Sequence, residues 1–370
     1  MKIVNWKFMI IGIDASRAFI KRRTGIEEYS YQVIKHLIDK LNGHQVVLYI
    51  RKNQTVDFEL PENWKIKIIN WPRLWTQVGL SLEMFFHPVD VLFVPAHTVS
   101  WIHPKKTIVT VHGLEYEVMP QAYSLWERVY MRFSIQNSCR WASKIISVSQ
   151  NTKKDLMRLY GVSEEKIKII PEGYSLDKNL KSNSYNQISN FKKYKPFLLF
   201  IGRLEERKNI IGIIKSFEIL KEKYKVPHKL VLAGRCGYGF SKIEVAIKSS
   251  KYNSEIVQLG FVRDEDKFDL IADSDVFMFP TFYEGFGIPV LEAQSVGVPV
   301  ITSNLSSMPE VVGDSAILVD PQDSDCIAER IYELISNKSL RDDIIKRGYE
   351  NVTKFSWEKC AKEIAEVINK

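Results

Sequence analysis

Short apolar runs alternate with stretches of helical periodicity along the 370-residue chain. In the first half, runs of buried parallel-strand type occupy residues 8–13, 45–51, 65–70, 89–95, 107–112, 144–148 and 166–171. Apolar spacing predicts helices over residues 26–41 and 124–142, and Ser149 is suited to cap a further helix that begins at Asn151. This order predicts a doubly wound parallel sheet.

The same alternation restarts in the second half. Strands are predicted over residues 197–201, 229–233, 256–259, 276–280 and 299–302, and helices over 210–224, 243–249, 265–272, 325–336, 339–354 and from about 356. Residues 178–195 are rich in Asn, Ser and Lys and have few apolar positions. We therefore predict an α/β protein with two Rossmann-like domains, over 1–178 and 196–355, a linker over 179–195, and a final helix over 356–370.

A glycine loop interrupts the alternation within residues 281–303, which read TFYEGFGIPVLEAQSVGVPVITS. Gly285 and Gly287 follow an apolar strand, and Pro289 stands where a helix would begin. A helix N-terminus beside such a loop favours a phosphate, because its free amides and its dipole both attract an anion.

Two carboxylates flank this loop, Glu284 before it and Glu292 within the helix. Carboxylates repel phosphate but accept hydrogen bonds from hydroxyl groups. A phosphate seat between two hydroxyl-binding carboxylates predicts a nucleotide sugar, with the ribose on one side and the hexose on the other.

Glu284 and Glu292 form an E-x7-E spacing inside FYEGFGIPVLEA, followed by G-x-PV and SSMPEVVGDSAILVDP. This stretch resembles the retaining GT-B glycosyltransferases of the large family that includes bacterial mannosyltransferases, and the resemblance extends over nearly the whole chain. It implies two domains that face each other across a cleft, with the last helix crossing back to the first domain. It also implies a nucleoside diphosphate sugar, with GDP-mannose as the expected donor, a glycan or lipid-linked acceptor in envelope polysaccharide synthesis, and no metal or other cofactor.

Arg203 and Lys208 follow the first strand of the second half, at the end of the strand where open α/β sheets bind ligands. A guanidinium fork and an ammonium point charge are suited to a diphosphate, and the resemblance assigns both residues to it. The alternative is a solvated charged cluster, because Glu205, Glu206 and Arg207 stand alongside.

The resemblance further implies that Glu292 holds the ribose, that Glu284 contacts the donor sugar, and that the loop backbone contacts sugar or phosphate, at Gly285, Phe286, Gly287 and Ile288. For Glu284 a carboxylate favoured by the helix dipole is the alternative. Val262 follows a strand and resembles the residue whose backbone receives the base, although an ordinary strand end would look the same.

In the first half, Gly25 opens a long helix and resembles the family's glycine loop near the donor phosphate. Many relatives have two glycines there, so a plain helix start remains the alternative. His112 ends a strand in TVHGLEYE, where a histidine can bind substrate hydroxyls or move a proton. The family commonly has an acidic residue after this histidine, and Gly113 replaces it. Asp14, at another strand end, is a candidate on the acceptor side.

Two motifs mislead. The D-x-D of Asp273 and Asp275 precedes a strand, so we interpret it as a turn rather than a metal site. The loop GRCGYG at 234–239 lacks the G-x-G-x-x-G spacing of NAD-binding proteins and remains only a minor donor-site candidate.

Composition indicates where in the cell the protein is expected to lie. Hydrophobic residues make up 45% and charged residues 26% of the chain, as in soluble proteins, and no apolar run approaches the roughly 20 residues that span a bilayer. The N-terminus runs into the first strand without a signal-peptide cleavage site. Four scattered cysteines favour a reducing, cytoplasmic setting.

The net charge of +8 lies entirely in the first half, which has 25 Lys and Arg against 17 Asp and Glu through Lys178. The excess suggests a membrane surface, a lipid-phosphate acceptor or nucleic acid as a partner, or only solubilising charge. The aromatic stretch 71–86 is either a membrane-docking segment or a buried helix. We expect a cytoplasmic protein, peripheral on the inner face of the membrane, with no nucleic-acid partner.

Three alternatives to mannosyl transfer stay open at the level of sequence. A transferase could use another donor such as a UDP-sugar, and a sugar-nucleotide epimerase could have the same fold. A basic membrane- or nucleic-acid-binding protein with an inactive transferase site belongs to a different class.

Overall fold

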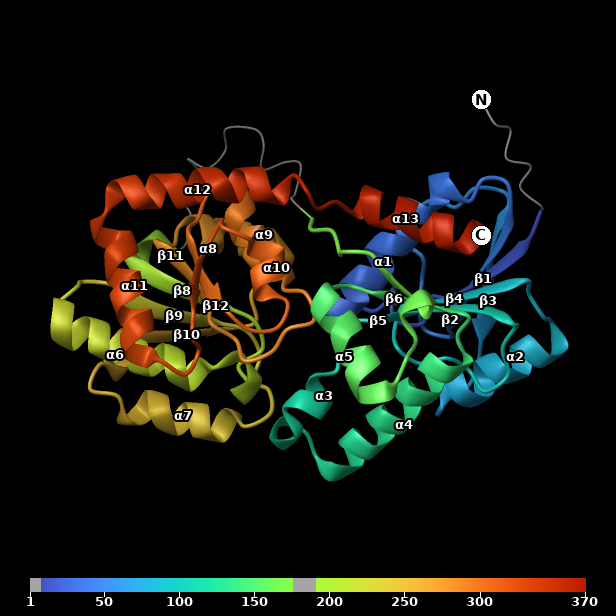
Figure 1. The fold of residues 1–370 in the computed structure, drawn as a ribbon, viewed down its shortest axis with the longest axis horizontal. Coiled ribbons are helices and arrows are strands. Elements are labelled where there is room, and N and C mark those ends of the chain that lie inside the picture. Colours follow the sequence, from blue (N-terminus) through green and yellow to red (C-terminus); the bar gives the residue numbers. More distant parts are fainter. Residues whose placement is uncertain (1–7, 176–190) are drawn as a thin grey trace. The chain divides into compact units, whose positions relative to one another are not determined.

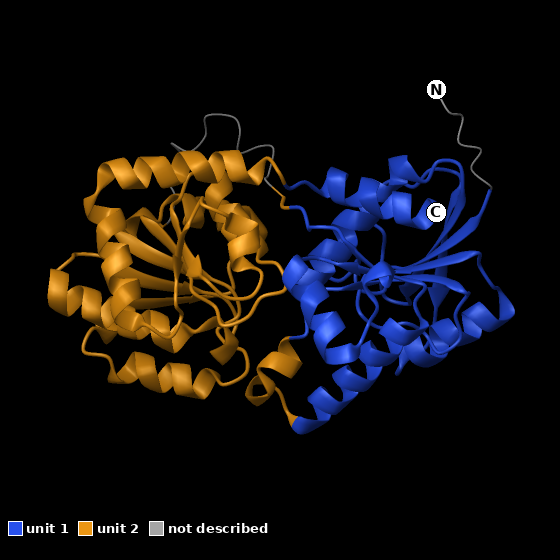
Figure 2. Cartoon of the chain, in the orientation of Figure 1, with its two compact units in different colours: residues 1–114, 125–173, 355–370 blue, residues 115–124, 174–354 orange. Residues whose placement is uncertain are grey.

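A computed structural model describes residues 8–175 and 191–370, which form two compact units (Figure 2). Unit 1 comprises Met1–Leu114, Leu125–Gly173 and Phe355–Lys370, and unit 2 comprises Glu115–Ser124 and Tyr174–Lys354. The linker predicted at 179–195 lies outside the described residues up to residue 190.

Unit 1 is built on a seven-stranded sheet of order β3-β2-β1-β4-β5-β6-β7, in which all neighbouring strands run parallel (Figure 1). Its strands are β1 (Ile10–Asp14), β2 (Gln45–Arg51), β3 (Trp64–Ile69), β4 (Val91–Val94), β5 (Lys106–Val111), β6 (Lys144–Ser147) and β7 (Ile167–Ile169). The chain moves outward from β1 to β3, then returns to β4 on the other side of β1. The predicted doubly wound sheet is confirmed.

The longer helices of unit 1 are α1 (Gly25–Leu37), α2 (Ser81–Phe86), α4 (Leu125–Trp141), α5 (Gln150–Tyr160) and α13 (Trp357–Asn369). Shorter turns are η1 (Ile38–Lys40), the π-helix η2 (Trp75–Leu80) and η4 (Glu164–Lys166). Ser149 accepts the Thr152 amide at 3.1 Å, which confirms the predicted cap of α5. Helix α13 packs against α1, where the rings of Tyr29 and Trp357 lie 5.9 Å apart.

Unit 2 has a six-stranded parallel sheet of order β10-β9-β8-β11-β12-β13. Its strands are β8 (Phe197–Ile201), β9 (Lys229–Ala233), β10 (Ile256–Gly260), β11 (Val276–Phe279), β12 (Val300–Ser303) and β13 (Ile317–Val319). The sequence patterns predicted all of these strands except β13, which has only three residues.

The helices of unit 2 are α3 (Glu115–Val118), α6 (Ile210–Tyr224), α7 (Phe240–Ser249), α8 (Asp264–Ala272), α9 (Ile288–Ser295), α10 (Met308–Val312), α11 (Ser324–Ser336) and α12 (Lys338–Val352). Single turns are η3 (Pro120–Ala122), η7 (Lys192–Tyr194), η8 (Glu206–Lys208) and η9 (Asn253–Glu255). The segment Glu115–Ser124 belongs to unit 2 although it follows β5 of unit 1 in the chain.

Three strands of unit 2 end at or one residue before a glycine with positive φ, namely Gly202 (155°), Gly234 (143°) and Gly260 (66°). A Cβ atom on Gly234 would lie 1.8 Å from the carbonyl oxygen of Gly202. Because only glycine permits this approach, the loops after β8 and β9 meet directly at the carboxyl edge of the sheet.

Candidate active site

The switch point of the unit 2 sheet lies between β8 and β11, neighbours from which the chain continues in opposite directions. The loops after these strands are tied together. Asn209 Nδ2 donates to the carbonyls of Pro280 at 3.0 Å and Pro321 at 2.6 Å, and the Phe282 amide donates to the Arg207 carbonyl at 3.1 Å. The predicted residues Lys208 on one loop and Glu284 on the other are thereby brought together, and Arg203 lies on the same loop as Lys208.

Glu284 is the centre of this cluster. Its carboxylate side chain is 11% exposed and accepts hydrogen bonds from Lys208 Nζ and, at 3.0 Å, from Arg207 Nη1. Burial would raise the pKa of Glu284, but the charges of Lys208 and Arg207 outweigh it and hold the pKa below its ordinary value. Glu284 therefore stays ionised, with only part of its hydrogen-bonding capacity committed.

Arg207 orients the two carboxylates on either side of it. Its guanidinium donates to the Tyr283 carbonyl at 2.8 Å, to Glu284 at 3.0 Å and to Glu205 at 2.8 Å. Burial would lower the pKa of Arg207, but Glu284, Glu115 and Glu205 together raise it. The sequence analysis named this arginine only as a neighbour in the alternative of a solvated cluster, because no local spacing reveals its contact with Glu284.

Arg203 and Lys208 differ in exposure. Arg203 is 61% exposed and lies 3.6 Å from the Glu205 carboxylate, so an arriving anion can reach it. Lys208 is buried, and burial together with the charge of Arg207 lowers its pKa. A negative group placed beside Lys208 would favour its charged form, so the pair is suited to a diphosphate.

The glycine loop is held by hydrogen bonds to two serines that immediately precede α10. Ser306 Oγ accepts the Glu284 amide at 3.0 Å, and Ser307 Oγ lies 2.9 and 3.0 Å from the carbonyls of Glu284 and Phe286. Gly287 caps α9 with a φ of 108°, and a Cβ there would lie 2.3 Å from Met308 Cε. Glycine is therefore required at this position.

The amides of the loop are available to a ligand. Among the described residues, the backbone N–H groups of Gly285, Gly287 and Ile288 donate no hydrogen bond. The first amides of α9 have the helix dipole behind them, as the predicted phosphate seat requires.

Glu292 has a partner that the sequence did not reveal. Its side chain is 9% exposed and accepts Lys267 Nζ of α8 at 2.6 Å. This ion pair ties α8 to α9 and engages one carboxylate oxygen, and the ribose-binding role of Glu292 stays a prediction. Val262 follows β10 next to Phe261, whose ring is 48% exposed and lies 4.7 Å from the guanidinium of Arg235. Its contact with the base also stays a prediction.

His112, in unit 1, is fully engaged. Its Nδ1 lies 2.8 Å from Glu172 Oε1, and its Nε2 lies 2.8 Å from the carbonyl oxygen of Pro95. Because a carbonyl only accepts, Nε2 carries a proton, and Nδ1 shares one with the carboxyl group. The predicted contact of His112 with a substrate hydroxyl would require one of these bonds to break.

Gly25 and Asp14 also lie in unit 1. A Cβ on Gly25 would meet nothing within 4 Å, so nothing within unit 1 requires a glycine there. Its predicted approach to the donor stays a prediction. Asp14 is 6% exposed, accepts the Ser16 amide at 3.0 Å, and has its pKa raised by burial.

The D-x-D motif has a structural role. Asp273 and Asp275 lie in the turn before β11, as predicted, where Asp273 pairs with Lys195 at 3.0 Å and Asp275 accepts the Phe197 amide at 3.0 Å. Within residues 8–175 and 191–370, no group of three or more His, Cys, Asp and Glu side chains is arranged to hold a metal.

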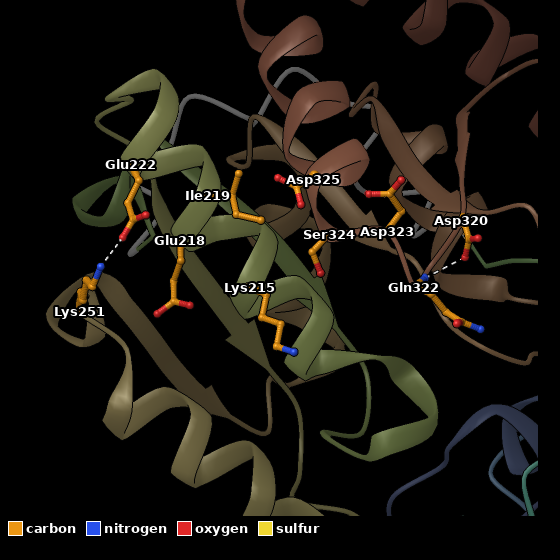
Figure 3. A pocket seen from close by; sticks show the side chains of 10 residues that line it. All are labelled: Lys215, Glu218, Ile219, Glu222, Lys251, Asp320, Gln322, Asp323, Ser324 and Asp325. Carbon is orange, nitrogen blue, oxygen red and sulfur yellow. Dashed lines mark hydrogen bonds and ion pairs between the residues drawn. The ribbon is translucent and has the colours of Figure 1, made fainter.

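A separate depression of about 640 Å³ lies between α6 and the N-terminus of α11 (Figure 3). Five acidic side chains line it with only two lysines, and the acidic ones are Glu218, Glu222, Asp320, Asp323 and Asp325. Such a lining repels a diphosphate, and none of the predicted site residues contributes to it.

Comparison with known proteins identifies the family. The sequence matches Glycosyltransferase Family 4 over residues 23–178 and Glycosyl transferases group 1 over residues 181–351. It is 33% identical over 261 residues to the O-antigen chain mannosyltransferase B of Escherichia coli, covering 69% of this chain and 68% of that protein.

Solved structures agree in fold. WaaG, a glycosyltransferase involved in lipopolysaccharide biosynthesis, superposes with a TM-score of 0.74 at 16% identity, over 97% of this chain and 99% of that one. Anabaena HepE in complex with UDP and glucose gives 0.70 at 18% identity, over 97% and 98%. The chain belongs to the GT-B glycosyltransferases.

Proposed function

We propose that this glycosyltransferase moves mannose from GDP-mannose to a hydroxyl of a glycan or lipid-linked acceptor in cell-envelope polysaccharide synthesis, with retention at the anomeric carbon. The observation that carries the proposal is the ion pair of Lys208 with Glu284 beside the free amides that begin α9, with Arg203 exposed on the same loop as Lys208. The likeness of the chain to the E. coli O-antigen chain mannosyltransferase supports the choice of sugar and pathway.

In this proposal each part of the cluster has one task. Arg203, Lys208 and the α9 amides bind the diphosphate and stabilise the charge that develops on it as the sugar leaves. Glu284, which stays ionised, accepts hydrogen bonds from hydroxyls of the hexose. Glu292 accepts those of the ribose through the oxygen that Lys267 does not engage.

The proposed chemistry is same-face transfer. The bond from the anomeric carbon to the departing phosphate oxygen breaks while the acceptor oxygen approaches from the same face, and the leaving phosphate takes the acceptor's proton. The protein contributes charge stabilisation and positioning. The proposed reaction uses the two side-chain cations rather than a metal ion.

The test is a thermal-shift panel of GDP, UDP, ADP, dTDP and their common sugar forms, with EDTA present. A ligand that binds the native state raises the melting temperature. We expect GDP and GDP-mannose to stabilise the wild type, Glu292→Ala to lose most of the shift, and the exposed control Glu350→Ala to keep it. No shift with any nucleotide would contradict the proposed donor site.

The alternatives give distinct results in the same material. Stabilisation by UDP and UDP-glucose alone would move the donor to a UDP-sugar, which HepE in complex with UDP and glucose makes the leading alternative. An epimerase would release an epimerised sugar without an acceptor. An inactive binding protein would show salt-dependent binding to anionic vesicles or DNA and no nucleotide shift.

We also propose that unit 1 rests on an anionic membrane surface through the outer face of α4. This helix turns apolar side chains to solvent, namely Leu125 (68% exposed), Trp126 (83%), Val129 (54%), Tyr130 (51%) and Phe133 (62%). Its inner face instead has Ser134 and Ser138, which hydrogen-bond to Thr98 at 3.0 Å and to the Val99 amide at 2.9 Å. An outward aromatic face is typical of an interfacial helix.

Neighbouring segments extend this surface. Phe85 (63% exposed) and Phe86 (67%) of α2 and Trp101 (54%) are exposed too, and α2 is joined to the Trp101 loop by the bond from the Ile102 amide to Ser81 Oγ at 3.2 Å. The stretch 71–86 therefore has both exposed and buried apolar side chains, because Trp75 and Met84 are buried. The excess positive charge of the first half supports an anionic surface as the partner.

Vesicle sedimentation tests this placement. We expect the protein to pellet with phosphatidylglycerol-containing vesicles more than with phosphatidylcholine vesicles, and the double variant Trp126→Glu/Phe133→Glu to stay in the supernatant. Val245→Glu, equally exposed at 65% but in unit 2, is the matched control. Equal pelleting of both variants would contradict the assignment to α4. None of the helices within the described parts of the chain is long and apolar enough to cross a bilayer.

A further inference from the structure

The unit 1 sheet has its own switch point, between β1 and β4. Asp14 is the last residue of β1, and His97 is the third residue after β4. The register pairs Ile13 with Phe93, so both strands end at the same level of the sheet. Open α/β sheets bind ligands at this place, outside the carboxyl ends of the strands.

His97 has an unusual backbone. Its φ is 46°, in the left-handed region that residues with a Cβ rarely occupy, and its amide donates to the Thr110 carbonyl at 3.0 Å. Conformations of this kind persist where the surroundings fix them, and they cluster at binding and catalytic sites.

The ring of His97 has no hydrogen-bond partner. Its Nδ1 is buried without one, and neither ring nitrogen makes a hydrogen bond within residues 8–175 and 191–370. The ring lies 5.1 Å from that of His112, at an interplanar angle of 77°. Buried polar groups without a partner are rare in folded proteins, and each calls for a ligand or a water molecule.

The charge state of His97 fits a hydroxyl rather than an anion. Burial, then the charges of His112 and Arg17, lower the pKa of His97 well below its ordinary value. The neutral imidazole offers one donor and one acceptor, as a sugar hydroxyl needs. On the neighbouring strand end, the Asp14 carboxylate accepts hydrogen bonds from the amide and the side chain of Ser16, and its remaining lone pairs leave capacity for another.

We propose that His97 is a sugar-binding residue, which hydrogen-bonds a hexose hydroxyl at the β1–β4 switch point beside Asp14. The inference rests on the proposed sugar transfer for its ligand class. A hexose of the acceptor and the hexosyl group of the donor share this chemistry, and the experiment separates them.

The test compares His97→Asn with wild type. Asparagine tolerates the left-handed region and leaves the backbone in place, while removing the ring. His103→Asn is the control, a histidine that precedes β5 at the opposite end of the sheet. Three quantities are measured: the melting temperature, saturation-transfer NMR titrations of methyl α-D-mannoside and methyl α-D-glucoside, and the calorimetric Kd values of GDP, GDP-mannose, UDP and UDP-glucose.

We expect His97→Asn to melt no lower than wild type and to bind the bare nucleotides equally well. Sugar binding should weaken about fivefold to tenfold, the loss of one hydrogen bond. Weaker methyl glycoside binding with an unchanged ratio of nucleotide-sugar to nucleotide Kd identifies the acceptor's sugar, whereas a changed ratio identifies the donor's hexosyl group.

Two results would overturn the proposal. One is sugar binding that is equal in the variant and wild type, or absent from both. The other is a His97→Asn protein that melts well below the His103→Asn control while binding sugars normally, which would make His97 a packing residue. Failure of every nucleotide to bind wild type would overturn the proposed donor site, and the methyl glycoside titration would still decide the role of His97.

Discussion

The two sheets have the same winding and the same kind of switch point, but opposite chemistry gathers at each. In unit 2, Arg207 and Lys208 share Glu284 in a buried cluster of ion pairs. In unit 1, the corresponding edge carries His97 and Asp14. Burial lowers the pKa of the histidine and raises the pKa of the aspartate. Both edges also hold a non-glycine residue with positive φ, Asn209 at 58° and His97 at 46°.

Asn209 and His97 differ in the hydrogen bonds that their side chains make. Asn209 donates two hydrogen bonds that join the loops after β8 and β11, so its strain serves the protein's own structure. His97 donates and accepts none through its ring among the described residues. The cationic cluster of unit 2 suits an anionic leaving group, whereas the uncharged imidazole of His97 suits hydroxyls, which agrees with the two binding roles proposed above.

The largest expected effect is at the charged edge. Lys208→Met removes a cation from the diphosphate, and we expect kcat for sugar transfer to fall about 100- to 1000-fold. Arg207 still pairs with Glu284 and Glu205 in this variant, so the melting temperature should fall less than in Arg207→Met. Lys242→Met removes a lysine that is 69% exposed and pairs with Glu206, and should retain activity. A loss below tenfold, or an equal loss in the control, would contradict the assignment.

Arg207→Met should act on stability instead. It leaves Glu205 without its closest partner and Glu284 with Lys208 alone, and removing one side of a buried ion pair costs about 3–5 kcal/mol. Urea unfolding at pH 7 measures the loss, with Arg330→Met, 46% exposed and paired with Glu333, as the control. Equal free energies of unfolding for both variants would contradict the role given to Arg207.

The lowered pKa of Glu284 predicts how the stability of the wild type depends on pH. The pKa of Glu284 is depressed below the ordinary 4.5, so its contribution to stability is present above pH 4.5 and is lost as the pH falls through the lower pKa of the folded state. Without Arg207 that pKa should rise, and acid unfolding should begin at a higher pH than in wild type.

Two glycines extend the comparison. Gly287→Ala forces a Cβ against Met308 at a φ of 108° and should cost about 1–3 kcal/mol of unfolding free energy together with donor binding. Gly25→Ala meets open space and should keep or raise stability by about 0.5–1 kcal/mol. If Gly25 approaches the donor as predicted, its variant loses kcat/KM without losing stability. Unchanged kinetics would make it a plain helix start.

The smallest expected effect is at the edge of unit 1 that carries His97. Because the pKa of His97 lies well below the ordinary 6.5, the unfolded chain takes up a proton before the folded one does. Stability should therefore fall as the pH drops below 6.5, by at most about 1.4 kcal/mol per pH unit from this residue. His97→Asn removes that part of the slope. Identical slopes for the two proteins between pH 7 and 5 would contradict a neutral imidazole at position 97.

Much of the fold could be predicted because it depends on local patterns. Continuous apolar runs identified all strands except β13, and Ser149 and Pro289 marked helix starts correctly. β13 and α10 were missed because elements of three and five residues are too short to show a period. The pattern also predicted α4 but not its orientation, since Ser134 and Ser138 turn inward and the aromatic side chains outward.

Some features of the candidate site were likewise predictable from local sequence, and others depend on tertiary packing. Glu284 and Lys208 were found from motif and loop position, and the structure brings them together. The contact of Arg207 with Glu284, 77 residues away, and that of Lys267 with Glu292 depend on tertiary packing and leave no mark in local spacing. His97 was missed for a similar reason, because a positive φ at a histidine follows from its surroundings rather than from its neighbours in sequence.

We propose that the charged edge of unit 2 binds the β-phosphate of the donor nucleotide. Isothermal titration of GDP and GMP into wild type and Lys208→Met, in EDTA, tests it directly. We predict that wild type binds GDP at least about tenfold more tightly than GMP, since a charge-assisted contact contributes about 1.5–3 kcal/mol, and that Lys208→Met loses this preference. Equal affinity for GDP and GMP in wild type, or a preference that survives in Lys208→Met, would show that Lys208 does not bind the β-phosphate.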